Sequence, residues 1–195
     1  MSVVKSFGKV LAVRIYGNRE IKTLPGEMTR PTSARVREAL FNIWQGRVRG
    51  CRWLDLCAGS GAMGAEALCR DAAEVVGIEK SGAACRVVKG NWQKVAKPEQ
   101  RYEVVKGDVV RSVTAVSGSF DLIYFDPPYA GGLYEAVLSG VMDRGVLTTE
   151  GEIAVEYGGG HWQPSDLPES VAAGLEILRE KRYGSTHLAF FQRSS

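Results

Sequence analysis

The hydrophobic pattern of the chain changes near residue 50. From there on, five short apolar runs occur without polar alternation, at residues 51–57, 74–79, 102–108, 120–125 and 152–157. The stretches between them predict helices that end near Cys69, span 81–96, reach about Val116 and span 132–143. Strands that are apolar on both faces and alternate with helices are typical of a parallel sheet covered on both sides.

The end of the chain follows a different pattern. Residues 175–193 read as two strands joined tightly around Gly184, which predicts an antiparallel hairpin at one side of the sheet. Five strand–helix units followed by this hairpin predict an α/β fold. We expect a doubly wound, mostly parallel, seven-stranded sheet of the Rossmann-like type.

The first fifty residues lie outside this alternation. Residues 3–24 are rich in β-branched and apolar side chains and are interrupted at Gly17-Asn18, which predicts a short β-hairpin arm. A helix then begins near Thr32 or Ser33, either of which can cap it. We therefore divide the chain into an arm, residues 1–28, and a main domain, residues 29–195.

Composition narrows the class of protein. A chain of 195 residues with 45% hydrophobic and 24% charged residues is ordinary for a soluble globular protein. Its apolar runs are shorter than the roughly 18–20 residues of a membrane helix, and its start lacks a signal-peptide core, so we expect a cytoplasmic location. The four cysteines lack C-x-x-C spacing and there are two histidines, so no metal site is expected.

Charge is distributed unevenly along the chain. Residues 1–50 hold ten Lys/Arg against three Asp/Glu, a net of +7, while residues 52–195 hold fifteen against nineteen, a net of −4. This asymmetry favours contact with a polyanion at one end, although a solvated basic surface gives the same pattern. The candidate phosphate contacts are Lys5, Lys9, Arg14, Arg19, Lys22, Arg30, Arg35 and Arg37.

A glycine-rich turn follows the first strand of the main domain. It contains Gly59, Ser60 and Gly61, and Glu79 lies twenty residues past Gly59, at the end of the second strand. Glycines let the backbone approach a ligand, the following helix offers free N–H groups, and the acid can accept from ribose hydroxyls. The pattern indicates a cofactor that contains adenosine, and a tight packing turn is the alternative.

Two further acids favour S-adenosylmethionine over a dinucleotide. Asp55 lies just before the glycines, where it would repel a pyrophosphate but could meet an ammonium group. Asp108 closes the third strand and could accept from an adenine amino group. Either acid could instead cap a helix.

The fourth strand ends in Asp126-Pro127-Pro128-Tyr129, at the edge where such sheets bind ligands. An exocyclic amine on a nucleobase is a poor nucleophile because its lone pair is delocalised. The Asp126 carboxylate and the Pro127 carbonyl can accept its two N–H bonds, held rigidly by the prolines. Tyr129 offers a ring for the base to stack on. The alternative is a plain strand–helix turn.

These motifs together resemble the bacterial family of small-subunit (16S) ribosomal RNA guanine-N2 methyltransferases, which have the class I S-adenosylmethionine-dependent fold. The resemblance lies in residues 29–44, 54–68, 77–80, 107–108 and 125–134. It implies methyl transfer from S-adenosylmethionine to guanine N2 of ribosomal RNA, either free or in the small-subunit particle, by a monomer. Three features depart from the family: an arm at 16–24 poor in glycine and lysine, Cys57 in place of an aromatic residue, and residues 158–175, which do not align.

The resemblance also implies roles for individual residues. Arg30 and Thr32 would pack over the methionine end of the cofactor. The full set of implied cofactor contacts is Arg30, Thr32, Asp55, Gly59, Ser60, Gly61, Glu79 on the ribose, Lys80, Asp108 near the adenine, Val109 and Asp126. Asp126, Pro127, Pro128 and Tyr129 would be catalytic, and Arg14, Arg19, Lys22, Tyr129 and Tyr134 would contact the RNA.

Other functions fit part of the same pattern. DNA adenine-N6 methylation uses the same four residues, but such enzymes usually add a target-recognition domain, for which this chain has little room. Protein-glutamine methylation uses a related pocket. A non-catalytic RNA-binding protein could retain the fold, and a nicotinamide dehydrogenase fits the glycine turn while leaving residues 126–129 unexplained.

Overall fold

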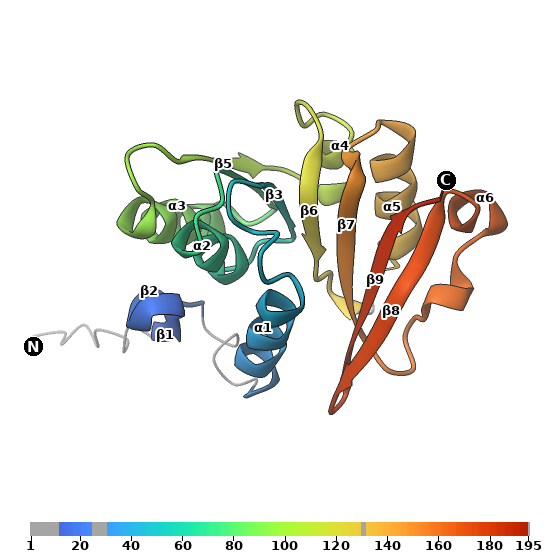
Figure 1. Ribbon diagram of the computed structural model, residues 1–195, viewed down its shortest axis with the longest axis horizontal. Helices are drawn as coiled ribbons and strands as arrows, with labels where there is room; N and C mark the ends of the chain where they lie inside the picture. The colour runs from blue at the N-terminus through green and yellow to red at the C-terminus, as the bar shows by residue number, and fades with distance from the viewer. Residues whose placement is uncertain (1–11, 25–30, 130–131, 195) are drawn as a thin grey trace, which may run out of the picture.

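A computed structural model describes residues 12–24, 31–129 and 132–194, with the backbone alone for residues 31–33. Its centre is one seven-stranded sheet in the order β5-β4-β3-β6-β7-β9-β8 (Figure 1). The strands are β3 (Arg52–Leu56), β4 (Glu74–Glu79), β5 (Arg101–Lys106), β6 (Phe120–Phe125), β7 (Leu147–Gly158), β8 (Leu175–Tyr183) and β9 (Thr186–Arg193). β3 to β7 are parallel, and β9 runs antiparallel to both neighbours. The predicted fold class is confirmed.

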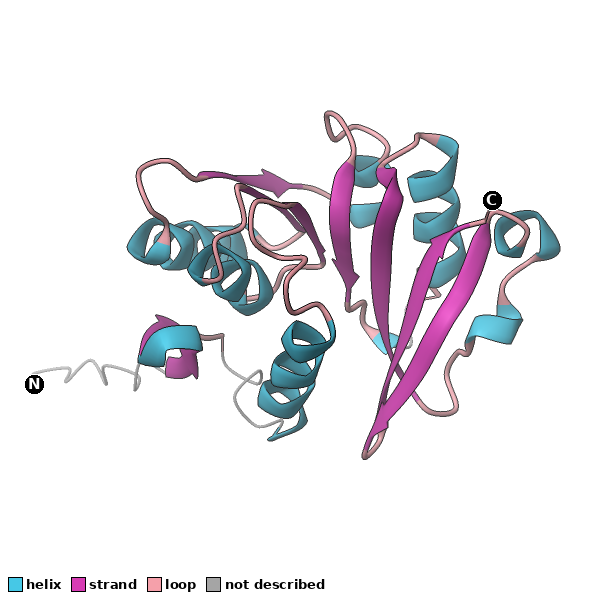
Figure 2. Ribbon diagram, in the orientation of Figure 1, coloured by secondary structure: helices cyan, strands magenta, loops and turns pink. Residues whose placement is uncertain are grey.

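Helices cover both faces of the sheet (Figure 2). The helices α1 (Pro31–Ile43), α2 (Ala62–Cys69) and α3 (Gly82–Val95) contribute to one core cluster. The helices α4 (Val109–Val113) and α5 (Tyr134–Asp143) contribute to the other. Successive strand residues alternate between the two: Trp53 belongs to the first cluster and Leu54 to the second. This double burial explains the apolar runs without polar alternation.

One strand begins earlier than its apolar pattern indicates. The sequence predicts a strand over 152–157, whereas β7 extends from Leu147 to Gly158. Its first half contains Thr148, Thr149 and Glu150, which are half-buried or exposed, so the periodic signal is missing there. The register between β6 and β7 also shifts between Phe120 and Leu122, which marks the irregular start of this pairing.

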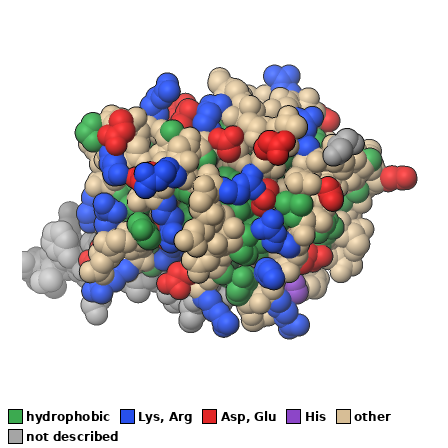
Figure 3. Space-filling model, in the orientation of Figure 1, with side chains coloured by type: hydrophobic (Ala, Val, Ile, Leu, Met, Phe, Trp, Pro, Cys, Tyr) green, Lys and Arg blue, Asp and Glu red, His purple; other side chains and the backbone are tan. Residues whose placement is uncertain are grey.

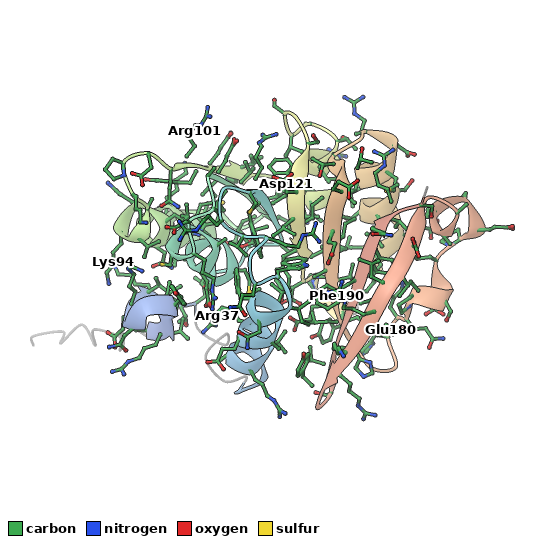
Figure 4. All side chains as sticks on the ribbon, in the orientation of Figure 1. Arg37, Lys94, Arg101, Asp121, Glu180 and Phe190 are labelled. Atoms are coloured by element: carbon green, nitrogen blue, oxygen red, sulfur yellow. The ribbon has the colours of Figure 1, made fainter. Side chains whose placement is uncertain are left out.

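The N-terminal hairpin is docked on the main domain. It comprises β1 (Ala12–Ile15), a turn at Tyr16–Asn18 and β2 (Arg19–Lys22), as predicted for this region. Ile15 and Ile21 are buried in the same core cluster as α1, α2 and α3. The Lys94 ammonium on α3 donates to the Glu20 carbonyl at 2.6 Å, and Figure 4 shows Lys94 beside the hairpin.

The segment between β7 and β8 contains two short helical elements, η4 (Pro164–Asp166) and α6 (Glu169–Ala172). Trp162 anchors its start, because its ring stacks on Tyr134 of α5 with centroids 4.2 Å apart. Within the described ranges, no helix is long and apolar enough to cross a membrane. The same residues contain no cluster of three or more His, Cys, Asp or Glu side chains suited to a metal ion.

Candidate active site

The two motifs singled out in the sequence meet where the strand order reverses. β3 and β6 are parallel neighbours in the sheet, and Leu56 pairs with Phe125 at their carboxyl ends. The Asp126 N–H lies 3.5 Å from the Leu56 carbonyl, so the glycine turn and residues 126–129 leave the sheet side by side. This edge lies toward the bottom of Figure 1, where β6 and β7 end and α1 is found. Open α/β sheets bind ligands at such a point.

Left-handed backbone shapes the turn after β3. Gly59 and Gly61 have φ of 55° and 75°, and Cys57, which is not a glycine, has φ of 65°. The Asp55 carboxylate, which is 2% exposed, accepts from the Gly64 N–H at 3.1 Å and so holds the first turn of α2 against β3. This hydrogen bond to the first turn of a helix is a capping contact, which was the alternative role considered for Asp55. Its predicted contact with the cofactor's ammonium group remains a prediction.

The position of the Trp92 ring explains why glycine is required at nearby positions. A Cβ at Gly64 would lie 2.3 Å from the Trp92 ring, and a Cβ at Gly77 would lie 2.5 Å from it. The Trp92 indole N–H also donates to the Gly61 carbonyl at 2.8 Å. The glycines therefore admit a buried indole beneath the turn, a packing role that sequence reasoning did not identify.

Asn91 connects the glycine turn to the N-terminal hairpin. Its side-chain amide nitrogen donates to the Ser60 carbonyl and to the Lys22 carbonyl, both at 2.8 Å, and its oxygen accepts from the Lys22 N–H at 2.9 Å. Asn91 is 2% exposed. The signal in the sequence was a polar residue on the apolar face of the helix predicted over 81–96.

Four acids converge on this edge of the sheet. Burial raises the pKa of the Cys57 thiol to about 12, and the negative charges of Asp126, Glu79, Asp55 and Asp108 add to this effect. All four carboxylates lie at or just after the carboxyl ends of the neighbouring strands β3, β4, β5 and β6. Two of them, Asp126 and Glu79, have the strongest electrostatic effects on the thiol.

Glu79 braces the turn. One carboxylate oxygen accepts from the Gly59 N–H at 2.9 Å, and the other accepts from the Ser81 N–H at 2.6 Å. Each carboxylate oxygen can accept more than one hydrogen bond, so the side chain keeps capacity for ribose hydroxyls. Ser60 is 5% exposed, so little of this residue is open to a ligand.

Asp108 is the N-cap of α4, where it accepts from the Val110 N–H at 3.2 Å. Lys80 lies beside it, with 3.8 Å between the ammonium and the carboxylate, and is 82% exposed. Val109 is buried, so only its backbone could reach a cofactor. The capping role is therefore present, while the adenine contact stays a prediction.

Tyr129 is fixed by a glutamate that the sequence analysis missed. Glu156 on β7 is 7% exposed and accepts hydrogen bonds from the hydroxyls of Tyr124 and, at 3.0 Å, Tyr129. The Tyr129 ring lies against Gly158, where a Cβ would be 2.4 Å from it. Burial, followed by the charges of Glu156 and Asp126, raises the pKa of Tyr129, so its hydroxyl remains a donor. In the sequence, the sign of this role was an acidic residue, Glu156, inside the apolar run 152–157.

The direct RNA contact predicted for Tyr134 does not fit its position. Tyr134 is 2% exposed, its ring is stacked on Trp162, and its hydroxyl donates to the Glu156 carbonyl at 3.4 Å. Its ring also meets Phe125 with centroids 5.9 Å apart, so it is packed between neighbours and is not available for a base to stack on. Next to Tyr129, Pro127 is buried and Pro128 is exposed.

The basic residues of the first quarter divide into two groups. Arg14, Arg19 and Lys22 are exposed on the hairpin, as a phosphate contact requires. Arg37 is not: it is 5% exposed, pairs with Glu66 at 2.5 Å and donates to the Arg14 carbonyl. The phosphate contact predicted for Arg37 is therefore wrong. In Figure 3, basic and acidic side chains are intermingled on the face in view.

Some predicted contacts cannot be placed. Lys5, Lys9 and Arg30 lie outside the described residues, and Thr32 is described by its backbone alone, in the first turn of α1.

The chain is similar to named proteins and solved structures over most of its length. The ribosomal RNA small subunit methyltransferase D of Escherichia coli K12 is 32% identical over 187 residues, covering 94% of this chain and 91% of that protein. Its namesake from Haemophilus influenzae is 28% identical over 180 residues, covering 91% and 90%. A solved Escherichia coli structure named yhhF superposes with a TM-score of 0.80 at 32% identity, covering 94% of this chain and 98% of that one.

The fold is shared with proteins named as methyltransferases, and it brings together the two motifs from which the sequence predicted an S-adenosylmethionine-dependent methyltransferase. A solved structure of SMU.776, a putative methyltransferase in complex with SAH, has a similar fold, with a TM-score of 0.74 at 12% identity, covering 96% of this chain and 57% of that one. The model of the family described as conserved hypothetical protein 95 matches residues 13–192, and the chain belongs to that family.

The residues present fit this cofactor. The left-handed turn at Gly59 and Gly61 keeps side chains away from the carboxyl edge of β3. Glu79 has unused acceptor capacity at the end of β4, where a ribose would lie, and Asp108 follows β5 on the adenine side. These are the residues that would hold S-adenosylmethionine.

Proposed function

We propose that this protein transfers a methyl group from S-adenosylmethionine to the exocyclic N2 amine of a guanine in 16S ribosomal RNA. The observation that carries the proposal is the meeting of residues 126–129 with the glycine turn at the β3–β6 junction. Relatives named ribosomal RNA small subunit methyltransferase D, one of them 32% identical, support the class of substrate. The choice of guanine N2 rests on the family resemblance of the motifs.

The chain's own groups prepare the amine for attack. When bound, the cofactor supplies an electrophilic methyl group on its sulfonium sulfur. The Asp126 carboxylate and the Pro127 carbonyl accept the two N–H bonds of the amine and favour the pyramidal, positively charged nitrogen that forms as the methyl group leaves sulfur, and the excess proton of this nitrogen then passes through Asp126 to solvent. Pro127 and Pro128 add no competing N–H and restrict the backbone, so these acceptors stay aimed at one place.

Tyr129 provides the surface on which the target base rests. Base–aromatic stacking contributes roughly 1–3 kcal/mol per base. The Glu156 carboxylate and the Gly158 backbone hold the ring, so a base stacked on it would have a defined orientation toward Asp126.

The exposed cations of the hairpin would bind the RNA backbone. Arg14, Arg19 and Lys22 are exposed on a hairpin that Asn91 joins to the glycine turn. Phosphate contacts of this kind position RNA without reading its sequence and weaken with salt. Arg14→Glu with Arg19→Glu should lower RNA affinity and its salt dependence. The matched control is Arg101→Glu. Arg101 is exposed at the start of β5, away from the carboxyl ends of the strands where the site lies.

Labelling of RNA tests the proposal directly. Small-subunit RNA and particles from a strain that lacks the gene are incubated with the protein and methyl-labelled S-adenosylmethionine, and the RNA is digested to nucleosides. We expect label in N2-methylguanosine, a loss of at least about 100-fold for Asp126→Ala and Asp126→Asn, and no loss for the exposed control Asp143→Asn.

Other outcomes would assign a different function. In a parallel incubation with DNA, label in N6-methyladenine would indicate the DNA enzyme, and label in particle protein would indicate glutamine methylation. Binding of S-adenosylmethionine without transfer to any RNA or particle would indicate a non-catalytic RNA-binding protein. Full activity of Asp126→Ala would remove Asp126 from the chemistry.

A further inference from the structure

A cavity of about 410 Å³ lies beside the 126–129 motif. Its walls come from the motif, the start of α5 and the segment after β7. The lining residues are Tyr129, Gly132, Tyr134, Glu135, His161, Trp162 and Asp166. The volume is within the range of about 300–1,000 Å³ typical of sites for small molecules, so a nucleobase fits.

Two rings line this cavity from opposite elements. The centroids of Tyr129 and His161 are 6.5 Å apart, and their planes are tilted by 37°. Carbon atoms in contact lie about 3.5 Å apart, so a base between two rings needs about 7 Å between them. His161 is exposed, and a small rotation of its side chain would bring the two rings to that spacing.

The supports of the two rings differ. Tyr129 is held by Glu156 and Gly158. His161 follows Gly160 in a segment that is anchored by its next residue, since Trp162 stacks on Tyr134 and meets Tyr157 edge-on at 5.2 Å. The Tyr129 ring is therefore fixed, while the His161 ring can turn on a backbone segment that is itself anchored.

The charge of the cavity indicates what enters it. The lining includes the carboxyl side chains of Glu135 and Asp166, and His161 is its only lining residue with a basic side chain. Asp166 also accepts from the Gln163 N–H at 3.0 Å and so holds the loop. Negative carboxylates disfavour phosphate, whereas aromatic walls and acceptors suit a neutral base with N–H donors.

We propose that His161 is the second wall of the base pocket, so that the nucleobase to be methylated is held between the Tyr129 and His161 rings with its sugar-phosphate outside. This inference rests on the proposed function and assigns a role to the segment between β7 and β8. His161 would be a substrate-binding residue that contributes through its ring.

The test compares three variants with the wild-type protein: His161→Ala, His161→Phe and Ser165→Ala, the last being an exposed neighbour outside the cavity lining. Steady-state rates are measured with small-subunit RNA or particles and with S-adenosylmethionine. We expect His161→Ala to lower kcat/KM for the RNA by about 5- to 100-fold, with KM for S-adenosylmethionine and Tm unchanged. His161→Phe should retain most of the activity, and Ser165→Ala all of it.

The outcomes separate the two proposals. If wild-type protein methylates RNA and His161→Ala is equally active, the inference is overturned and the proposed function stands. An activity of His161→Phe as low as that of His161→Ala would also overturn it, because a stacking role requires only the ring. If wild-type protein labels no RNA or particle, the proposed function fails, and the pocket assignment fails with it.

Discussion

The side-chain amide of Asn91 donates to the main-chain carbonyl of Ser60 at 2.8 Å, although 31 positions separate the two residues. The same amide donates to Lys22 in the N-terminal hairpin. One buried side chain on α3 thus holds both the turn that would carry the cofactor and the arm that would meet the RNA. The arm is consequently not an independent appendage: its position is tied to the cofactor site.

Replacing Asn91 should loosen both attachments. Asn91→Ala removes three hydrogen bonds, one of them to the carbonyl of the buried residue Ser60, so we expect the free energy of unfolding to fall by about 2–4 kcal/mol. Urea unfolding measures this change, and calorimetry should show weaker binding of S-adenosylmethionine. Gln93→Ala, at an exposed position on the same helix, is the control. Equal stability of the two variants would contradict a structural role for the Asn91 contacts.

Arg37 should contribute to stability and not to RNA affinity. Its guanidinium is buried against Glu66, which also pairs with Arg70 at 2.9 Å. Arg37→Ala removes the buried partner of Glu66 but leaves it paired with Arg70, so the loss in the free energy of unfolding should be about 2–3 kcal/mol, below that of a fully unpaired buried charge. Thermal or urea unfolding checks this. The exposed neighbour Arg35 provides the comparison, since Arg35→Ala should change stability by no more than about 0.5 kcal/mol.

Gly158 should be required for the position of Tyr129. A Cβ at Gly158 would lie 2.4 Å from the Tyr129 ring, whereas a Cβ at Gly159 would meet only His187, at 3.7 Å. Gly158→Ala must therefore push the tyrosine ring away from its place, and we expect kcat to fall by up to about 100-fold. Methylation assays on Gly158→Ala and Gly159→Ala test this, with circular dichroism to confirm folding. Similar activity of both variants would show that Tyr129 tolerates displacement.

The Cys57 thiol should be unreactive in the folded protein. An unfolded thiol ionises near its ordinary pKa of 9.0, while burial and the four surrounding carboxylates raise the pKa of Cys57 to about 12. At pH 8.5, alkylation of Cys57 by iodoacetamide should be at least about 100-fold slower in native than in urea-unfolded protein. Peptide mass spectrometry gives both rates.

The same shift predicts how stability depends on pH. Because the folded state retains the Cys57 proton up to a higher pH, its contribution to stability is fully present below pH 9 and is lost as the pH rises toward 12. Cys57→Ala should reduce this alkaline loss. Rapid alkylation of native Cys57 at pH 8.5 would contradict the burial of the thiol and the raised pKa that follows from it.

The sequence alone was sufficient for the fold because its signals are local. Apolar runs without alternation require a sheet buried on both faces, and Gly184 marks the tight turn of the last hairpin, where the backbone has φ of 66°. The glycine turn and residues 126–129 were recognisable for the same reason, since each meets a backbone requirement within a few residues. Their meeting followed from parallel strands having their carboxyl ends at one edge.

Tertiary structure decided which side chains have partners. Arg37 and Tyr134 looked like surface contacts in the sequence, yet one is buried against Glu66 and the other against Trp162. Glu156, Asn91 and Trp92 read as ordinary members of a strand and a helix until the fold placed them beside Tyr129, Ser60 and Gly61. Backbone preferences act over a few neighbouring residues, whereas hydrogen bonding and burial depend on groups that only folding brings together. The sequence by itself therefore determined the sheet and the position of the site, and only the packed structure determined what holds that site in shape.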